Sequence, residues 1–236
     1  MTKFLITGVG SGLGRYLHER FSGVGLTRDN FAEIPQEYEV IIHCAFNSAQ
    51  NYKTEDLERV ILEDISLASN LVKRSHRLFI FISSIDVHRC QNAYAMTKKI
   101  VEYLIKKNAK SYLILRPSAL LGKYSRSNSL IKMIQGDCSL TLSKDSVFNY
   151  VLHQDIGDFI QFAIQNKIEG IYDLAATESI VLGKVAAIVE EVKGWRNIQY
   201  GSYQYLCSDI DVSEIIKVGG FPLKTSEQVI REFLKL

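Results

Sequence analysis

The amino-acid sequence predicts an α/β protein: a doubly wound parallel β-sheet with helices on both faces and a small C-terminal lobe. Short apolar runs rich in Val, Ile, Leu and Phe alternate along the chain with longer amphipathic segments. A strand that is apolar throughout is typical of a sheet covered on both faces, where neither side of the strand meets water. Regular alternation of strands and helices favours parallel pairing with helical crossovers.

The first half of the chain supplies most of the expected sheet and its helices. Two amphipathic segments, 53–74 and 93–107, are predicted as helices because apolar residues recur in them at spacings of three and four. Five apolar runs are predicted as buried strands; these are KFLIT (3–7), VGLT (24–27), EVIIHCA (39–45), LFIFIS (78–83) and YLILR (112–116).

From about residue 123 the pattern changes. A polar stretch, KYSRSNS, precedes a predicted helix through Met133. The later predicted elements are the apolar run FNYVL (148–152), a helix at 155–166, a strand at GIYDLA (170–175), a helix at 181–193 and a short C-terminal helix. We expect residues 1–122 to form the core and residues 123–236 to form most of a discontinuous lobe, with 148–175 returning in part to the core.

Composition and charge exclude several classes of protein. The 236 residues are 47% hydrophobic, which is enough for a core without disulfides or metals. Basic and acidic residues number 28 and 26 and are well mixed, so nothing favours nucleic acid or a membrane surface as a partner. No apolar run reaches the roughly 18 residues of a membrane span, and no secretory signal is recognisable.

The cysteines are scattered, with no CxxC pair and no histidine at metal-ligand spacing; they are Cys44, Cys90, Cys138 and Cys207. Isolated cysteines of this kind are typical of reduced thiols in an intracellular protein. The sequence therefore predicts a cytoplasmic protein without a metal site.

A glycine-rich turn, TGVGSGLG (7–14), follows the first predicted strand and precedes a helix. Glycines at this junction permit a tight turn and a close approach of the backbone to a pyrophosphate, whose charge the helix N-terminus stabilises. The position of the turn after an apolar strand predicts a Rossmann-like dinucleotide site. Its expected contacts are Gly8, Gly10, Ser11, Gly12, Leu13 and Gly14.

The end of the second strand bears on the choice of cofactor. In NAD sites a carboxylate about 20 residues after the turn bonds the ribose 2′-hydroxyl, but here the strand ends Leu26–Thr27–Arg28. Arg28, beside Thr27 and helped by Arg15, would hold a 2′-phosphate, which favours NADP(H). NAD(H) stays open, because a shift of one or two residues would bring Asp29 to the ribose.

A second set of residues lies in SSIDVHRCQNAYAMTKK (83–99), where Tyr94 and Lys98 stand at i and i+4 and share one helix face. With six other segments in order along the chain, it resembles the short-chain dehydrogenase/reductase superfamily. The resemblance is strongest to the extended branch of nucleotide-sugar epimerases, dehydratases and reductases, although the glycine spacing resembles the single-domain branch more. The other segments are TGVGSGLG (7–14), VIIHCA (40–45), FISSIDV (81–87), LRPSALLG (115–122), FNYVLHQDIGDFI (148–160) and DVSEIIKVGGFPLKTSEQVIREFL (211–234).

This resemblance implies specific roles. Tyr94 would be the general acid/base, with its pKa lowered from about 10 by the Lys98 ammonium and the nicotinamide charge. Lys98 would also bond the nicotinamide ribose, and Ser84, rather than Ser83, would orient the substrate oxygen. Ala45 and Pro117 would complete the cofactor site at the ends of their strands.

The chain departs from the family at several places. Only about a dozen residues separate the second and third predicted strands, too few for the usual helix–strand–helix, so the sheet is expected to lack the usual third strand or to keep a remnant. Ser84 and Tyr94 are ten residues apart, which suggests a more open pocket. Ile85 stands between Ser84 and Asp86 where dehydratases tend to have an acid, which argues against dehydration.

Two other positions leave alternatives open. His88 would serve either as a proton donor or, more simply, as a loop residue. Asp64 stands where the family commonly has an asparagine of a proton relay; it would anchor a water or the Lys98 ammonium, or be a charge on a helix face.

The resemblance implies a nucleotide-sugar substrate, whose diphosphate Lys123 and Arg126, with Asn128, would hold. His153 and Asp155 are expected to have structural roles. A homodimer through the helices at 53–74 and 93–107 is possible. The residues do not separate a reductase from an epimerase. A dinucleotide-sensing protein on the same fold is the alternative, and a purely structural role would leave the glycine turn and the Ser-Tyr-Lys set unexplained.

Overall fold

The computed structural model of the chain describes residues 2–31, 35–47, 54–207 and 209–236. Contacts between Cα atoms divide it into two compact units. Unit 1 comprises Met1–Pro117 and Gly157–Tyr172, and unit 2 comprises Ser118–Ile156 and Asp173–Leu236. The chain therefore leaves unit 1, returns to it for the greater part of one helix and the first residues of a strand, and ends in unit 2.

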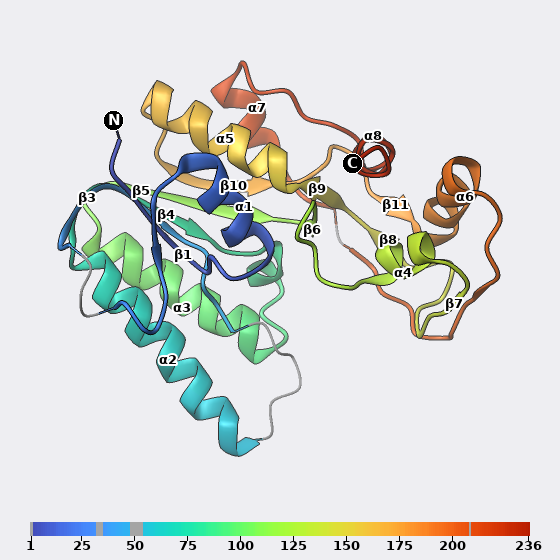
Figure 1. Cartoon of the computed structure of the whole chain (residues 1–236), viewed down its shortest axis with the longest axis horizontal. Coiled ribbons are helices and arrows are strands. Elements are labelled where there is room, and N and C mark those ends of the chain that lie inside the picture. The colour runs from blue at the N-terminus through green and yellow to red at the C-terminus, as the bar shows by residue number, and fades with distance from the viewer. Residues whose placement is uncertain (1, 32–34, 48–53, 208) are drawn as a thin grey trace. The chain divides into compact units, whose positions relative to one another are not determined.

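Among the described residues, unit 1 is built on a six-stranded sheet with the order β10-β5-β4-β3-β1-β2 (Figure 1). The strands are β1 (Phe4–Thr7), β2 (Val24–Leu26), β3 (Glu37–His43), β4 (Ser75–Ile82), β5 (Tyr112–Pro117) and β10 (Gly170–Leu174). β1 pairs in parallel with β2 and β3, and β4 pairs in parallel with β3 and β5. The structure thus confirms the predicted parallel α/β architecture and each predicted strand of the sheet.

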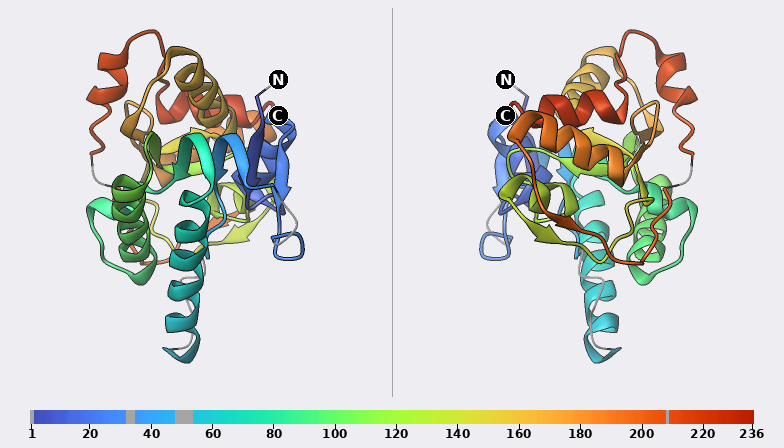
Figure 2. Two further views of the ribbon diagram at one scale, coloured as in Figure 1. Left: turned by 90° about the vertical axis from the view of Figure 1, so that its left-hand side faces the viewer. Right: turned by 90° about the vertical axis from the view of Figure 1, so that its right-hand side faces the viewer.

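Helices cover both faces of this sheet, and they are α1 (Gly12–Phe21), α2 (Thr54–Val72), α3 (Ala93–Asn108) and α5 (His153–Asn166). α2 and α3 lie together on one face, and α1 and α5 lie on the other (Figures 1 and 2). Arg20 of α1 joins the second pair, because its Nη2 donates to Asp158 at 2.7 Å and to Gln161 at 2.9 Å in α5. Buried strand residues such as Ile41, Phe79 and Phe81 form one core with the α2–α3 layer.

The prediction about the third strand is confirmed in the described residues. β2 pairs with β1 and is the last strand on its side of the sheet. The carbonyl of Gly25 in β2 accepts from Asn30 Nδ2 at 2.9 Å, so a side chain takes the place of a strand partner there. Arg74 holds the loop that follows: it donates to Pro35 O at 2.9 Å, and its guanidinium lies 5.3 Å from the centre of the Phe31 ring.

Unit 2 combines short strands with helices. Its strand pairs are β6 (Ala119–Leu121) with β9 (Tyr150–Leu152), β8 (Val147–Phe148) with β11 (Ile180–Val181), and β7 (Cys138–Ser139) with β12 (Ile198–Gln199). Its helices are α4 (Ser129–Gln135), α6 (Leu182–Lys193), α7 (Ser213–Val218) and α8 (Ser226–Phe233). A buried cluster that includes Leu130, Met133, Val185 and Ile230 joins α4, α6 and α8.

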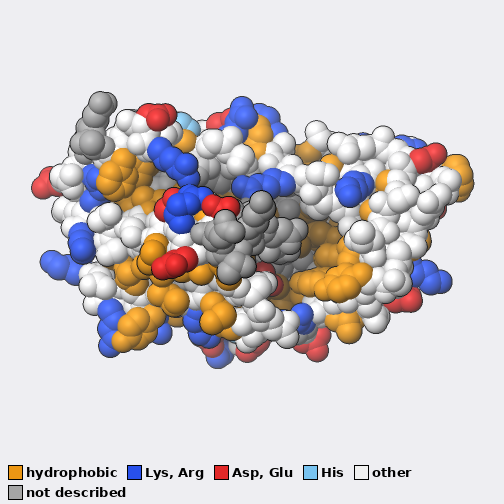
Figure 3. All heavy atoms as spheres, turned by 90° about the horizontal axis from the view of Figure 1, so that it is seen from below, with side chains coloured by type: hydrophobic (Ala, Val, Ile, Leu, Met, Phe, Trp, Pro, Cys, Tyr) orange, Lys and Arg blue, Asp and Glu red, His pale blue; other side chains and the backbone are white. Residues whose placement is uncertain are grey.

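Most of the unpredicted elements are short. The two-residue strands and α7 carry too few residues for a periodic pattern to emerge. Within the described ranges, no helix has both the length and the apolarity that a bilayer crossing requires. Basic and acidic side chains lie interspersed on the face drawn in Figure 3.

Candidate functional site

The candidate site in unit 1 lies where parallel strands end. β1, β3 and β4 are neighbours, and their last residues are Thr7, His43 and Ile82. Because the carboxyl ends of parallel strands meet at one edge of a sheet, the segments that follow these three residues come together there. They are the glycine turn, the Cys44–Asn47 turn and the Ser83–Ser84 pair.

The glycine turn has the geometry that the sequence predicts for close packing. Gly8 has φ +74°, and a Cβ there would lie 2.9 Å from Ala45 N. A Cβ on Gly14 would lie 2.3 Å from Gly8 O, so α1 packs directly on the turn. At Gly10, by contrast, an added Cβ would meet no atom within 4 Å, and the turn is open on this side.

The N-terminus of α1 adds a positive end to this opening. Its N-cap, Ser11, makes no side-chain capping bond, and the first turn of α1 has no acidic residue. The first amides of a helix carry partial positive charge and bind anions where no side chain caps them. The residues at the turn therefore fit a dinucleotide pyrophosphate.

Thr7 fixes the turn that follows β3. Its Oγ1 accepts from Cys44 N at 3.0 Å and from Ala45 N at 2.8 Å, and bonds His43 Nδ1 at 2.9 Å. Burial lowers the pKa of His43 to about 3, so the ring is neutral. Since Thr7 Oγ1 accepts two amides, its own hydrogen goes to Nδ1, which assigns the Nε2–H tautomer to His43.

The two serines after β4 have different partners. Ser83 Oγ donates to Glu102 Oε1 at 2.6 Å. Glu102 also accepts from Arg116 Nε at 2.9 Å and Nη2 at 2.7 Å, so Ser83 belongs to a buried charged network. Ser84 instead caps the 3₁₀ turn Ile85–His88: it donates to Asp86 Oδ2 at 3.1 Å and accepts from Asp86 N at 3.2 Å.

α3 brings the tyrosine and the lysine to the same edge. The helix begins after Asn92, whose Oδ1 accepts from Ala95 N at 2.8 Å, and so places Tyr94 in the first turn and Lys98 one turn later. Lys98 is only 2% exposed, and its Nζ donates to Ile82 O at 2.7 Å. The Nζ lies 5.2 Å from the centre of the Tyr94 ring.

Burial and nearby acidic groups have opposite effects on the pKa of Lys98. Burial lowers the pKa of Lys98 to about 7, while the acidic groups around it, Asp64 first, favour the ammonium. Asp64 is 5% exposed and accepts from Asn47 N at 3.2 Å and Asn47 Nδ2 at 2.9 Å. Burial raises the pKa of Asp64 to about 6, and its bonds to Asn47 oppose that rise. A cavity of about 50 Å³ lies between Asp64 and Tyr94.

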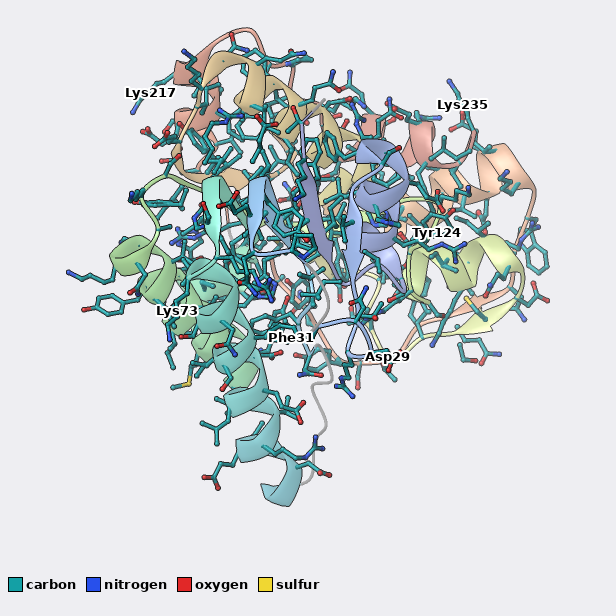
Figure 4. All side chains as sticks on the ribbon, turned by 60° about the vertical axis from the view of Figure 1, so that its left-hand side comes forward. Asp29, Phe31, Lys73, Tyr124, Lys217 and Lys235 are labelled. Atoms are coloured by element: carbon teal, nitrogen blue, oxygen red, sulfur yellow. The ribbon has the colours of Figure 1, made fainter. Side chains whose placement is uncertain are left out.

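The residues expected to select the cofactor lie on the surface. The side chain of Arg28 is 90% exposed, and its Nη2 lies 3.7 Å from Glu63 Oε2 in α2. Thr27 N donates to Asn30 Oδ1 at 2.8 Å. Asp29 is exposed on the loop that also carries Phe31 (Figure 4). Arg15 is half-exposed and pairs with Glu19 at 3.4 Å.

The expected substrate residues belong to unit 2. Lys123 and Arg126 are exposed in the loop before α4. Asn128 caps α4, since its Oδ1 accepts from Ile131 N at 3.0 Å. Asp155 accepts from Leu152 N at 3.1 Å and Lys224 Nζ at 2.8 Å.

Three other positions named in the sequence analysis are placed as follows. The buried His153 ring fills the space that a Cβ on Gly122 would occupy. His88 is exposed at the end of the 3₁₀ turn in unit 1. Pro117 is buried and ends β5.

Sequence reasoning gave Asp64 as an anchor of the Lys98 ammonium in one of its alternatives, but it missed the aromatic rings around Lys98. Phe46 lies 4.0 Å and Phe81 4.9 Å from Lys98 Nζ, measured to the ring centres. Asn47, which joins Asp64 to the Phe46 turn, was also missed. A signal was present for Phe46, because it directly follows the strand end that carries Ala45.

In the described part of the chain, no three His, Cys, Asp or Glu side chains gather as a metal site would require.

No family model and no curated protein matches the chain. Solved structures do. The first is a UDP-N-acetylglucosamine 4-epimerase from Methanobrevibacter ruminantium M1 in complex with UDP-N-acetylmuramic acid, with a TM-score of 0.83, 15% identity and 99% and 97% of the two chains covered. The second is a dTDP-4-dehydrorhamnose reductase from Bacillus anthracis in complex with NADP, with a TM-score of 0.80, 18% identity and coverage of 99% and 98%. The third is the Bordetella bronchiseptica enzyme WbmH in complex with NAD⁺, with a TM-score of 0.75, 14% identity and coverage of 98% and 96%.

The chain has the fold of these enzymes. The likeness extends over almost the full length of both chains in each comparison. It confirms the Rossmann-like α/β fold that the resemblance implied. At such low identity the likeness concerns the fold alone, so activity has to be argued from the residues of the site.

Proposed function

We propose that the protein is an NAD(P)-dependent oxidoreductase or epimerase of the extended short-chain dehydrogenase/reductase type. One observation carries the proposal: a buried ammonium, Lys98, lies beside Tyr94 at the same sheet edge as a glycine turn that is open at Gly10. A buried cation next to a phenol favours the phenolate, which a proton-transferring tyrosine needs near neutral pH.

Each residue has a distinct task in this reaction. The nicotinamide cofactor, when bound, supplies the hydride acceptor or donor at a carbonyl or alcohol carbon. Tyr94 gives or takes the proton on the substrate oxygen. Lys98, which is 2% exposed, stabilises the ionised form of Tyr94. Ser84 orients the substrate oxygen, and the commitment of Ser83 to Glu102 supports this choice.

The dinucleotide would lie along the glycine turn, with the pyrophosphate at Gly10–Gly12 and Ala45 and Pro117 nearer the nicotinamide. We propose NADP(H) as the preferred cofactor because Arg28 is exposed at the end of β2. NAD(H) is the alternative, with Asp29 at the ribose. The similar structures include one with NADP and one with NAD⁺, so they do not decide between the two.

We propose a nucleotide sugar as the substrate. The support is the fold shared with an epimerase in complex with UDP-N-acetylmuramic acid. Unit 1 would bind the cofactor and unit 2 the substrate, whose diphosphate would be held by Lys123 and Arg126. These two side chains are exposed cations, as diphosphate binding requires.

A homodimer through α2 and α3 is part of the proposal. Met96, Ile100 and Tyr103 are exposed by 55%, 47% and 63%, and their spacing places them along one side of α3. Leu62 of α2 is also 55% exposed. Apolar side chains aligned in this way are typical of a helix face that another chain covers.

The second candidate function is a dinucleotide-binding sensor with little turnover. The burial of Lys98 favours it, because a side chain that is 2% exposed offers little access to a ligand at the sheet edge. A Tyr94→Phe variant distinguishes the two functions. Loss of turnover with cofactor binding retained supports the enzyme, whereas unchanged behaviour in every assay supports the sensor.

The first experiment is a titration with NADPH and with NADH, followed through the fluorescence of the dinucleotide itself. Wild type and Arg28→Ala are compared, and Arg77→Ala, which removes an exposed arginine near the start of β4, is the control. Tight NADPH binding that weakens selectively in Arg28→Ala supports the proposed cofactor, and UDP- and dTDP-sugars are then screened for turnover. Preference for NADH in both proteins would overturn the role of Arg28. Binding of neither would overturn the proposed function.

A further inference from the structure

An aromatic box surrounds the ammonium of Lys98. The centres of three rings lie within 6 Å of Nζ, the range of cation–π attraction: Phe46 at 4.0 Å, Phe81 at 4.9 Å and Tyr94 at 5.2 Å. The rings also contact one another. Phe46 meets Tyr94 edge-on, with centres 5.6 Å apart and an interplanar angle of 88°, and lies 6.2 Å from Phe81.

Hydrogen bonding alone leaves this ammonium under-satisfied. An ammonium has three N–H donors, and among the described residues Lys98 Nζ has one hydrogen-bond acceptor, the carbonyl of Ile82. A buried cation without enough acceptors tends to lose its proton. The faces of the three rings, which carry negative charge density, oppose that loss.

The acidic and titratable groups around Lys98 come from several elements. Asp64 in α2, Cys44 after β3, Glu102 in α3 and Asp86 in the 3₁₀ turn all act on it, and Lys98 in turn acts on His43. Burial raises the pKa of Cys44 to about 12 and lowers that of His43 to about 3, so both are neutral near pH 7.

The remaining carboxylates, those of Glu102, Asp86 and Asp64, form hydrogen bonds with groups other than Lys98. Glu102 already accepts two bonds from Arg116, and Asp86 accepts one from Ser84. Asp64 is bonded to Asn47. Within the described ranges, none of these carboxylates forms an ion pair with Lys98, and the contacts of its Nζ are three ring faces and one carbonyl.

Phe46 is held in place at both ends of its turn. Thr7 Oγ1 accepts from the amides of Cys44 and Ala45 before it. The Asp64 carboxylate accepts from the amide and the side chain of Asn47 after it. Two acceptors from different elements thus fix the four-residue turn and the ring that it carries.

We propose that Phe46 is a positioning residue that keeps the Lys98 ammonium charged beside Tyr94, and that Asp64, through Asn47, fixes the turn that presents this ring. The consequence for proton transfer at Tyr94 rests on the proposed function, but the effect on Lys98 does not.

The test follows the ionisation of Lys98 itself. Protein labelled with ¹³C-lysine is titrated by NMR, and the Lys98 Cε signal is assigned with Lys98→Met. Phe46→Leu keeps an apolar side chain of similar size without a ring face, and we expect it to lower the proton affinity of Lys98 about tenfold. Phe46→Tyr, which restores a ring, should return the midpoint to within about threefold of wild type.

Two further variants separate the parts of the proposal. Phe31→Leu removes another ring that faces a cation in unit 1, that of Arg74, and should leave the Lys98 midpoint unchanged. Asn47→Ala retains the Asp64 charge and the Phe46 ring but removes the side-chain bond between Asn47 and Asp64. It should shift the Phe46 ring signals and lower the Lys98 proton affinity by about threefold, less than Phe46→Leu does.

An unchanged midpoint in folded Phe46→Leu would overturn the role of the ring, and unchanged Phe46 signals in Asn47→Ala would overturn the role of the Asp64 clamp. Circular dichroism establishes that each variant is folded. NADPH titration of the same wild-type sample tests the proposed function separately. If Lys98 responds to Phe46→Leu but NADPH does not bind, the box stands and the proposed function falls.

Discussion

The buried network of Ser83, Glu102 and Arg116 gives the sharpest stability prediction. The side chain of Glu102 is 4% exposed and that of Arg116 is 15% exposed, and two bonds of 2.9 and 2.7 Å join them. Glu102→Gln retains the shape of the side chain but removes its charge. The Arg116 guanidinium then stays largely buried but loses the carboxylate that accepts two of its N–H bonds, and Ser83 loses a charged acceptor.

The size of the effect follows from this burial. Removing one partner of a buried ion pair costs about 3–5 kcal/mol, and the partial exposure of Arg116 favours the lower end, about 3 kcal/mol. For a chain of this length, each kcal/mol lowers the melting temperature by about 2–4 °C, so we expect a fall of about 6–12 °C. Because Ser83 is next to Ser84, catalytic turnover should decline as well.

The assay must report on unit 1. The single tryptophan, Trp195, is in unit 2, so far-UV circular dichroism is the better probe of the unfolding transition. Glu191→Gln is the matched control: Glu191 makes two bonds of 3.0 Å to Arg231, but both side chains are on the surface, and little change is expected. A loss below about 1 kcal/mol in Glu102→Gln would refute the reasoning from burial.

Three other predictions use different features. Gly8→Ala should destabilise the fold by at least about 1 kcal/mol, because of its φ of +74° and the nearby Ala45 amide, whereas Gly10→Ala should keep the melting temperature and weaken NADPH binding. The pKa of Asp64 is raised from 3.8 to about 6 in the folded state, so the unfolded state releases this proton first as pH rises. Wild type should therefore lose stability relative to Asp64→Asn between about pH 4 and pH 6, by at most about 3 kcal/mol in urea titrations, and a flat difference would contradict this. Ile100→Asp should shift the molecular mass in light scattering from dimer to monomer, and a mass unaffected by the change would argue against the α3 face.

The sequence predicted secondary structure most accurately where an apolar run or a helical periodicity was long. The sheet strands, α2 and α3 were predicted within a few residues, since continuous apolar runs and three-to-four spacing are strong patterns. The absent third strand was also predicted, because chain length alone limits what fits between β2 and β3. The side-chain bonds of Asn30 and Arg74 to backbone carbonyls in this region were not predictable, since no periodic pattern marks them and Pro35 lies 39 residues from Arg74.

The same limit applies to the site. Spacing places Tyr94 and Lys98 on one helix face, but it does not say what covers Lys98. Phe46, in the turn after β3, and Phe81, in β4, are 52 and 17 residues earlier in the chain, and only the three-dimensional pairing of the strands brings them to Lys98. Glu102 is on the same helix, four residues after Lys98. Its partner Arg116 is in β5, so spacing along α3 does not predict this ion pair.

The free-energy cost of burying Lys98 and Asp64 helps to decide between a structural role for the protein and an enzymatic one. Burial moves the pKa of Lys98 from 10.5 down to about 7 and that of Asp64 from 3.8 up to about 6, so both charged forms are disfavoured in the folded protein. Apolar side chains of similar size would pack at these positions without that cost. Groups held near neutral pH at a sheet edge, beside a turn that fits a pyrophosphate, are what proton transfer requires and what a scaffold does not. The energetics therefore favour the enzyme, and they predict that Lys98→Met raises the melting temperature while abolishing turnover; a less stable Lys98→Met protein would remove this support.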